Sequence, residues 1–212
     1  MYNPAHFVED RADVLTTFIH EHPLAVLVTC GADGPEASHV PMVFHPETGP
    51  HGVLRCHLAR ANSQWKSIAD SSSVLAVFAG AEHYITPGWY PSTQEHGKVV
   101  PTWNYVAVHV RGRGRLMQTP DELLAHLKEL TGRNEQPFEN PWTVESAPAE
   151  YIHALTNAIV GIEITVSSME GKWKASQNRT RADREGVVAG LTELNTSESL
   201  AMSEIVKKAN GL

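Results

Sequence analysis

The stretch VAVHVRGRGRL at residues 106–116 indicates the fold class of this 212-residue chain. Its even positions begin with three valines and end with a leucine, whereas Arg111, Arg113 and Arg115 occupy odd positions. Successive side chains of a β-strand point to opposite faces of the sheet. The period of two therefore predicts a strand with one face in a core and three guanidinium groups on the other.

Further strands are expected on both sides of this stretch. Residues 24–29, LAVLVT, and 74–79, VLAVFA, are short apolar runs typical of strands buried on both faces. Residues 36–44, 52–58 and 159–166 complete the set, and the last of these alternates with a period of two. Six or more strands joined mostly by short turns favour an antiparallel barrel that is mainly β with α decoration.

Helices are expected around the sheet, and the most secure begins with a capping box at Thr119. The expected bounds are Asp10 to Pro23, Thr119 to Gly132, about 196–210 and, for a short helix, 63–70. The Pro-rich segment 133–149 is expected to be a long connection, acting as a lid, an interface arm or a mobile loop.

The composition is that of a globular protein, with 42% hydrophobic residues, 19% charged residues and a net charge of −7. No apolar run reaches the ~18 residues of a membrane-spanning helix, and residues 1–13 lack the basic start and apolar block of a signal peptide. We therefore expect a cytoplasmic protein without a membrane segment, and a single domain over residues 1–212.

Several kinds of chemistry lack support in the sequence. Cys30 and Cys56 lie in apolar, strand-like stretches, so we expect buried free thiols rather than a disulfide. The segment 20–22, His-Glu-His, has no third ligand nearby, so no metal site is expected. No nucleophile elbow, Walker loop, dinucleotide fingerprint or HExxH motif occurs.

Cations concentrate in KWKASQNRTRADR, residues 172–184, although the chain as a whole is acidic. This segment carries five Lys or Arg residues and one acid, and Ser176, Gln177 and Asn178 follow one another within it. Such side chains suit a phosphate group or the polar edge of a heterocycle. A solvated strand end would account for the same residues, and the pattern alone leaves both interpretations open.

A second candidate is HLARANSQW at residues 57–65, where Arg60 and Asn62 stand between an expected strand and an expected helix. A helix N-terminus and a guanidinium group are both suited to phosphate binding. A capped helix with a surface arginine is the alternative.

A third candidate is KVVPTWNYVAVHV at residues 98–110, where Asn104 lies between Trp103 and Tyr105 at the mouth of a strand. Aromatic side chains at this position indicate core or interface packing. The amide between them favours a ligand instead, because an apolar site would leave it without hydrogen bonds.

The order of these segments resembles the PaiB family, whose members are described as FMN-binding negative transcriptional regulators. The matching pieces are MYNPAHF at 1–7, SHVPMVF at 38–44, HLARANSQW at 57–65, YITPGWYP at 84–91, VPTWNYVAVHVRG at 100–112 and EGKWKASQNR at 170–179. The resemblance implies an FMN-binding split β-barrel related to pyridoxamine-phosphate-oxidase-like and flavin-reductase-like proteins. It also implies a bacterial protein and a homodimer with the flavin in a cleft between subunits.

The resemblance further implies which residues contact FMN. They are His39 and Pro41 near the flavin ring, Arg60 and Asn62 at the phosphate and ribityl chain, Thr102, Trp103 and Asn104 beside the flavin, and Lys174, Ser176, Gln177 and Asn178 as a polar clamp. The residues do not identify a catalytic acid or base.

Two functions agree with the resemblance. One is a regulator in which flavin occupancy or redox state alters a repressing dimer, and the other is an FMN-dependent oxidoreductase that uses a nicotinamide cofactor. The net charge disfavours direct DNA contact, which only the basic run 179–184 supports. The twelve histidines leave a third interpretation, haem handling, open.

Overall fold

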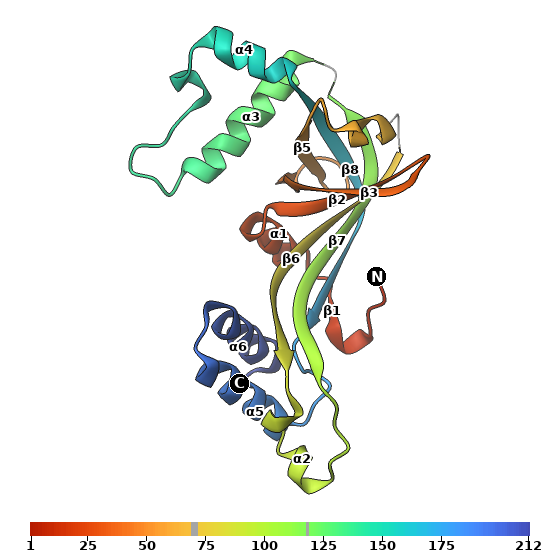
Figure 1. Ribbon diagram of the computed structural model, residues 1–212, viewed down its shortest axis with the longest axis vertical. Coiled ribbons are helices and arrows are strands. Elements are labelled where there is room, and N and C mark those ends of the chain that lie inside the picture. Colours follow the sequence, from red (N-terminus) through yellow and green to blue (C-terminus); the bar gives the residue numbers. More distant parts are fainter. Residues whose placement is uncertain (69–71, 118) are drawn as a thin grey trace. The chain divides into compact units, whose positions relative to one another are not determined.

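The computed structural model describes residues 1–68, 72–117 and 119–212 (Figure 1). The chain divides into two compact units. Unit 1 comprises Met1–Leu15, Ala79–Val108 and Glu170–Leu212, and unit 2 comprises Thr16–Phe78 and His109–Met169.

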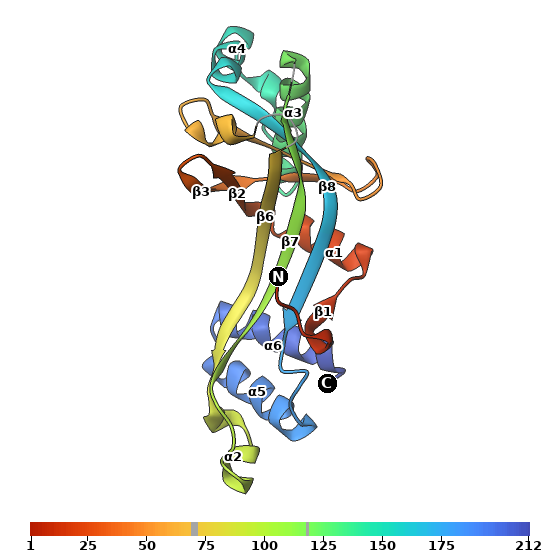
Figure 2. The same ribbon diagram turned by 90° about the vertical axis from the view of Figure 1, so that its right-hand side faces the viewer.

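Within the described residues, eight strands form one sheet in the order β3-β2-β6-β7-β8-β5-β4, with β1 paired to β8. Their bounds are Val8–Glu9 (β1), Leu24–Gly31 (β2), Gly34–Pro41 (β3), Val43–His45 (β4), Val53–Ala59 (β5), Ser72–Ile85 (β6), Thr102–Leu116 (β7) and Ile159–Lys174 (β8). Figure 2 shows the three long strands β6, β7 and β8 side by side. The expected mainly antiparallel β fold with helical decoration is confirmed.

Six α-helices and four short 3-10 helices accompany the strands in the described part of the chain. Their bounds are Ala12–Glu21 (α1), Ser92–Glu95 (α2), Pro120–Glu135 (α3), Ala149–Asn157 (α4), Arg181–Leu194 (α5), Ser197–Asn210 (α6), Ala5–Phe7 (η1), Ser63–Ser67 (η2), Pro87–Trp89 (η3) and Val144–Ser146 (η4). None of these helices is long and apolar enough to cross a membrane.

The helices of the structure differ from the predicted ones in several places. Helix α3 begins at the expected capping box of Thr119 but continues past Gly132, because the Arg133–Glu129 ion pair of 2.8 Å supports another turn. The expected loop 133–149 contains the end of α3 and the start of α4, and α5 was not predicted. The short helix over 63–70 is a 3-10 helix that ends at Ser67, and residues 69–70 lie outside the described residues.

The apolar strands 24–29 and 74–79 are not buried on both faces, contrary to the prediction. In β2, Ala25 and Leu27 are fully buried, whereas Val26 and Val28 are only half-buried. Burial in β6 alternates in the same way. An apolar run therefore marks a strand here without showing that both faces of the sheet are covered.

Strand β7 confirms the alternation of buried and exposed side chains predicted for residues 106–116. Val106, Val108 and Val110 are buried, and Arg111 and Arg113 are exposed. The intervening glycines face the buried side, where a Cβ atom on Gly114 would overlap the Ile68 side chain. The RGRGR pattern thus places guanidinium groups on one face and leaves room for close packing on the other.

The two cysteines differ in their surroundings. Cys56 is fully buried, and burial raises its pKa to about 12, which keeps its thiol protonated. Cys30 is exposed, contrary to the expectation of two buried thiols, because it lies near the end of β2 beside the turn to β3. Both are free thiols.

In unit 1 the helices α5 and α6 pack on each other and enclose a small core (Figure 1). Its buried members are Ile85, Tyr90, Ala175, Val187, Leu191, Met202 and Val206. Ala175 belongs to the turn that follows β8. The core therefore supports the polar segment that comes after this alanine.

In unit 2, charged and polar side chains connect α3 to the sheet. Glu163 of β8 accepts hydrogen bonds from Arg55 and Arg115, both at 2.9 Å. Next to this ion-pair network, the Nδ1 atom of His57 lies 3.2 Å from the Nε2 atom of His126, which is fully buried on α3. The His57–His126 contact thus links α3 to β5 through two imidazole groups, whose charge depends on pH.

We expect the unfolding free energy to fall on acidification because of His126. Burial and then the positive charges of His57, Arg55 and His45 lower its pKa from 6.5 to about 3. The unfolded chain takes up this proton near pH 6.5 and the folded chain does not, so stability is lost from about pH 6.5 toward pH 3, by up to about 1.4 kcal/mol per pH unit and proton. Urea unfolding over this pH range measures the slope.

The His126→Gln variant removes this titration and should flatten the slope. His153→Gln is the matched control, because His153 lies on an exposed face of α4. An equal slope in His126→Gln and the unaltered protein would contradict the role of the buried imidazole.

Candidate functional site

The segment after β8 is a tight turn built around Ser176 in unit 1. Ser176 has φ of 64°, a left-handed conformation that is uncommon outside glycine. The Gln177 side chain stabilises it: its Oε1 accepts from the Ala175 amide at 2.7 Å, and its Nε2 donates to the Trp173 carbonyl at 2.6 Å. Gln177 therefore shapes this turn, and residues held in such conformations often belong to functional sites.

Asn104 on β7 is joined to this turn. Its Nδ2 donates to the Ser176 hydroxyl at 2.9 Å, and only 1% of the residue is exposed. Its Oδ1 is buried and, among the described residues, has no hydrogen-bond partner. A buried acceptor without a donor is costly, so this oxygen is suited to receive a hydrogen bond from a ligand.

Lys174 lies beside the same turn. Its Nζ donates to the Thr102 hydroxyl at 2.6 Å and lies 6.0 Å from the centre of the Tyr105 ring. Partial burial, followed by the positive charges of Lys172 and Arg179, lowers the pKa of Lys174 below its usual value. The lowered pKa shows that positive charges crowd around Lys174, and a bound anion would offset them.

Lys172 and Arg179 complete a cationic cluster, which we define as Lys172, Lys174 and Arg179. Lys172 is 7% exposed and lies 5.4 Å from the centre of the Tyr105 ring, and Arg179 lies 4.7 Å from the centre of the Tyr90 ring. Contacts with aromatic faces stabilise such cations where water is scarce. The sequence prediction omits Lys172 and Arg179 from the cofactor residues, although both belong to the basic run at 172–184.

Strand alternation separates Trp103 from these residues. Thr102 and Asn104 share one face of β7, and Trp103 lies on the other, 51% exposed and 6.0 Å from the ring centre of Tyr84. Asn178 is exposed. Unit 1 thus brings together five of the predicted residues, namely Thr102, Asn104, Lys174, Ser176 and Gln177.

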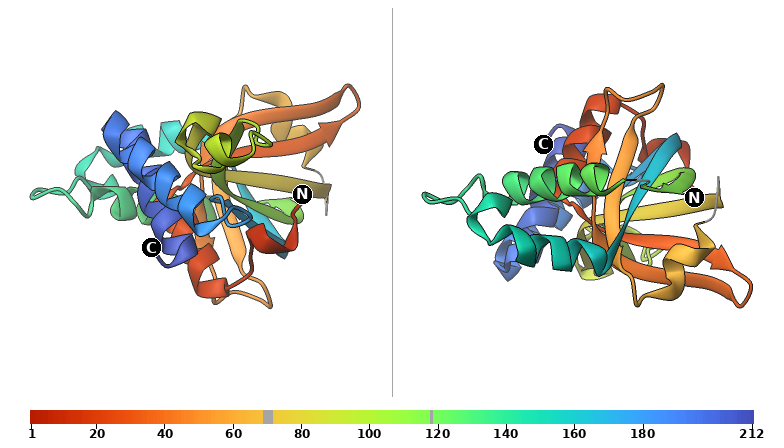
Figure 3. Two further views of the ribbon diagram at one scale, coloured as in Figure 1. Left: turned by 90° about the horizontal axis from the view of Figure 1, so that it is seen from below. Right: turned by 90° about the horizontal axis from the view of Figure 1, so that it is seen from above.

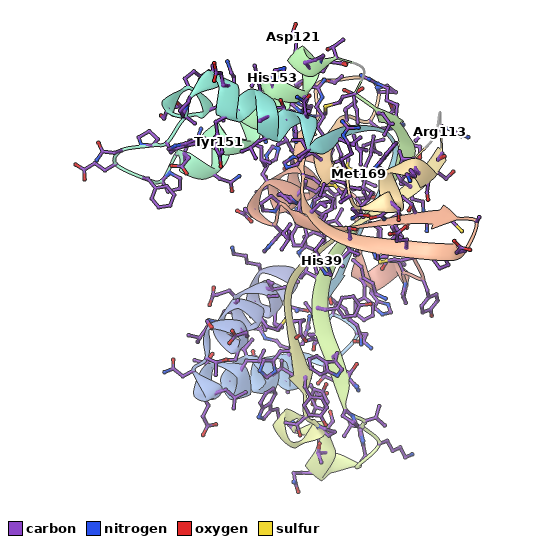
Figure 4. The ribbon with its side chains drawn as sticks, turned by 45° about the horizontal axis from the view of Figure 1, so that its top comes forward. His39, Arg113, Asp121, Tyr151, His153 and Met169 are labelled. Carbon is purple, nitrogen blue, oxygen red and sulfur yellow. The ribbon has the colours of Figure 1, made fainter. Side chains whose placement is uncertain are left out.

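The remaining predicted residues belong to unit 2. Asn62 caps η2, accepting from the Gln64 amide at 3.0 Å and donating to Ser38 at 2.9 Å. His39 and Pro41 lie on β3, where His39 is exposed (Figure 4). The helix-cap interpretation of Asn62 is therefore correct, and its contact with Ser38 ties η2 to the strand that carries His39.

Arg60 donates from Nε to the Asn157 carbonyl at 2.8 Å and from a terminal nitrogen to the Ile159 carbonyl at 3.0 Å. The Asn157 carbonyl lies at the C-terminal end of α4, where a cation is favourable, and Ile159 is the first residue of β8. Arg60 thus has a structural role in unit 2, and its contact with phosphate stays a prediction.

Gln64, which no sequence pattern marks as a site residue, organises the same region. It is fully buried, and its Nε2 donates to the carbonyls of Leu27 and Glu36, which lie on neighbouring strands. The motif HLARANSQW contains this residue, but only the tertiary structure shows that it joins β2 to β3.

Comparison with known proteins agrees with these observations. Residues 1–168 match the family described as "Putative FMN-binding domain". The protein named protease synthase and sporulation protein PAI 2 from Bacillus subtilis is 30% identical over 98% of this chain and 97% of its own. The chain belongs to the PaiB family.

Relatives of this chain come from fungi as well as from bacteria. An uncharacterized protein from Emericella nidulans is 34% identical, with 98% of this chain and 97% of the other covered. Among solved structures, a conserved hypothetical protein from Mycobacterium tuberculosis has a TM-score of 0.57 at 14% identity, covering 85% of this chain and 95% of that one. The fold is the split β-barrel expected from the PaiB resemblance.

FMN is the cofactor of the PaiB family, and the donor set of unit 1 fits it. The cationic cluster is suited to the phosphate, which carries about two negative charges at neutral pH. The buried Oδ1 of Asn104 is suited to a donor of the ligand. Among the described residues, no group of three or more His, Cys, Asp or Glu side chains is placed to hold a metal ion.

Proposed function

We propose that this protein is an FMN-binding regulator of the PaiB type whose flavin phosphate is held by Lys172, Lys174 and Arg179. The observation that carries the proposal is the cationic cluster beside the buried, unpaired oxygen of Asn104. The hydrogen bonds described for Lys172 and Lys174 go to uncharged oxygens of Tyr2 and Thr102, and the buried Oδ1 of Asn104 has no partner among the described residues. A ligand with an anionic end and a hydrogen-bond donor would satisfy both the lysines and this oxygen.

Within this proposal each residue of unit 1 has a defined task. Lys174 donates to the phosphate, Gln177 keeps Ser176 in its left-handed conformation, and Ser176 fixes the amide of Asn104. When bound, FMN supplies hydride and single-electron transfer. His39, Pro41, Arg60, Asn62, Trp103 and Asn178 are proposed to complete the site as the family resemblance implies.

The proposed active form is a homodimer in which both subunits contribute residues to each flavin site. Two observations favour an interface: Trp103 and Tyr84 form an exposed edge-to-face pair in unit 1, and Leu24 is 60% exposed in unit 2. Exposed aromatic side chains are enriched where proteins associate. Sedimentation of the purified protein tests the dimer, which a monomer at all concentrations would contradict.

Regulation is proposed to act through a partner rather than by direct contact with DNA. The net charge of −7 opposes binding to phosphate backbones, and the basic residues at 179–184 are partly engaged, since Arg181 pairs with Glu185 at 2.8 Å and Arg184 donates to Asn210 at 2.8 Å. The alternative is an FMN-dependent oxidoreductase, which the exposed Trp103 ring favours because a planar nicotinamide could stack on it.

The absorption spectrum of the purified protein with added FMN separates these functions. We expect bound FMN with a shifted flavin spectrum that persists when NADH or NADPH is added without oxygen. Bleaching by a nicotinamide would favour the oxidoreductase, and absence of any flavin binding would overturn the assignment of the cationic cluster. A Soret band on titration with haem would support the haem-handling interpretation instead.

A further inference from the structure

The segment 119–158 of unit 2, which we call the acidic arm, differs in charge from the rest of the chain. It contains seven Asp or Glu residues and two Lys or Arg residues, and so carries five of the seven net negative charges. Helices α3 and α4 of this arm lie side by side, and the connection between them loops beyond their ends (Figure 3).

Both cations of the acidic arm are already paired with acids of the arm. Lys128 lies 2.6 Å from Glu145, and Arg133 lies 2.8 Å from Glu129. Five acids therefore remain without a cation from the arm itself, namely Asp121, Glu122, Glu135, Glu139 and Glu150. One of them, Glu122, contacts Arg115 of β7. The surface of the arm is thus negative after its internal pairs are formed.

The acidic arm also contains an apolar groove of about 480 Å³ between α3, η4 and α4. Its apolar lining consists of Pro120, Leu124, Val144, Ala147, Ala149 and Ile152. Asp121, labelled on α3 in Figure 4, and His153, labelled on α4, lie at this groove. The charged residues of the lining are Asp121 and the Lys128–Glu145 ion pair, so the apolar floor has a rim with a net negative charge. Such a groove favours a ligand that is apolar on one side and basic on the other.

Four further large apolar side chains of the arm are exposed outside the residues that line the groove. Phe138, Trp142, Tyr151 and Leu155 all belong to the arm and are 63%, 44%, 57% and 47% exposed. Several exposed apolar side chains in one segment indicate an interaction surface, whereas single ones are common on any protein. A small molecule confined to the groove would leave these four side chains exposed, whereas a polypeptide is long enough to reach beyond the groove lining.

We propose that the groove of the acidic arm is a docking site for a basic amphipathic helix of a partner protein. Such a helix places apolar residues at i, i+3, i+4 and i+7 into a groove, and its basic residues would meet Asp121 at the groove and the net negative charge of the arm around it. Because the arm is negatively charged, the partner helix is expected to carry a positive charge. This site does not depend on flavin binding, so it holds or fails separately from the proposed function.

The test uses the full chain and a labelled synthetic helix of about 18 Leu and Lys residues arranged with helical periodicity. Fluorescence anisotropy should show saturable binding, unchanged by FMN. The same residues in scrambled order and a Leu and Glu version should bind at least about tenfold more weakly. Equal binding of the scrambled peptide would reduce the effect to net charge and overturn the proposal.

Substitutions locate the binding on the groove. Ile152→Gln removes an apolar contact without changing charge and should weaken binding about tenfold, whereas Leu200→Gln, at a residue 38% exposed on α6, should not. Equal effects of the two variants would contradict the assignment.

A charge-reversal variant provides a second test that does not depend on correct folding of the Ile152 variant. Asp121→Lys combined with Glu150→Lys should shift the preference toward the Leu and Glu peptide, and an unchanged preference would overturn the proposal. Self-association that is lost in Ile152→Gln, with no peptide bound, would assign the groove to a second copy of the chain instead.

Discussion

Lys174→Ala is expected to weaken FMN binding about tenfold to a hundredfold. The Lys174 ammonium group is partly buried next to Lys172 and Arg179, so its hydrogen bond to a phosphate would be charge-assisted. Hydrogen bonds of this kind contribute about 1.5–3 kcal/mol, which corresponds to that change in affinity. Titration of the flavin-free protein with FMN, followed by flavin fluorescence, measures the dissociation constant.

Riboflavin, which lacks the phosphate, identifies the group that Lys174 contacts. Its affinity should be the same in Lys174→Ala and in the unaltered protein, while FMN affinity falls. Equal losses for both ligands would place Lys174 away from the phosphate, and no loss for either would remove it from the site. Lys208→Ala is the control, because Lys208 is exposed near the end of α6.

The double variant Lys174→Ala with Gln177→Ala should bind FMN more weakly than Lys174→Ala alone. The Gln177 side chain joins the Ala175 amide to the Trp173 carbonyl and thereby supports the conformation of Ser176. Gln177 is therefore a positioning residue, and Gln177→Ala alone should reduce the affinity for FMN and riboflavin alike. An unchanged FMN affinity in the double variant would refute both roles.

Gly186→Ala is expected to be the most destabilising of the small substitutions in unit 1. A Cβ atom at Gly186 of α5 would overlap the carbonyl oxygen of Trp89 in η3, and backbone atoms cannot turn aside as a side chain can. Overpacking of this kind costs about 1–3 kcal/mol, and α5 can escape it only by moving away from η3. Urea unfolding measures the loss.

Gly132→Ala is the matched control for this prediction. Gly132 also lies within a helix, α3, but a Cβ atom there would meet nothing within 4 Å among the described residues. Because alanine is a better helix former, this change should raise the unfolding free energy by up to about 1 kcal/mol. Similar effects of the two substitutions would show that packing against Trp89 does not matter.

Local sequence patterns predicted the elements whose signals are complete within a few residues. Alternation at 106–116 identified β7, and the capping box at Thr119 identified the start of α3, because strand faces and helix caps depend on neighbouring residues. Helix α5 was missed because its buried positions include Asp183 and Gly190, which do not form an apolar stripe. The strand predicted at 159–166 stops short of the end of β8 at Lys174, because the second half of β8 is polar.

The β fold class, the family and the residue types of the site could all be predicted from the amino-acid sequence, because motifs such as VPTWNY and GKWKASQN are short continuous segments. Which of those residues meet is seen only in the folded chain. Asn104 and Ser176 are 72 positions apart, and Lys174 reaches Thr102 over the same separation, since β7 and β8 are neighbours in the sheet. Pairing between distant strands depends on the whole sheet, and no local pattern encodes it.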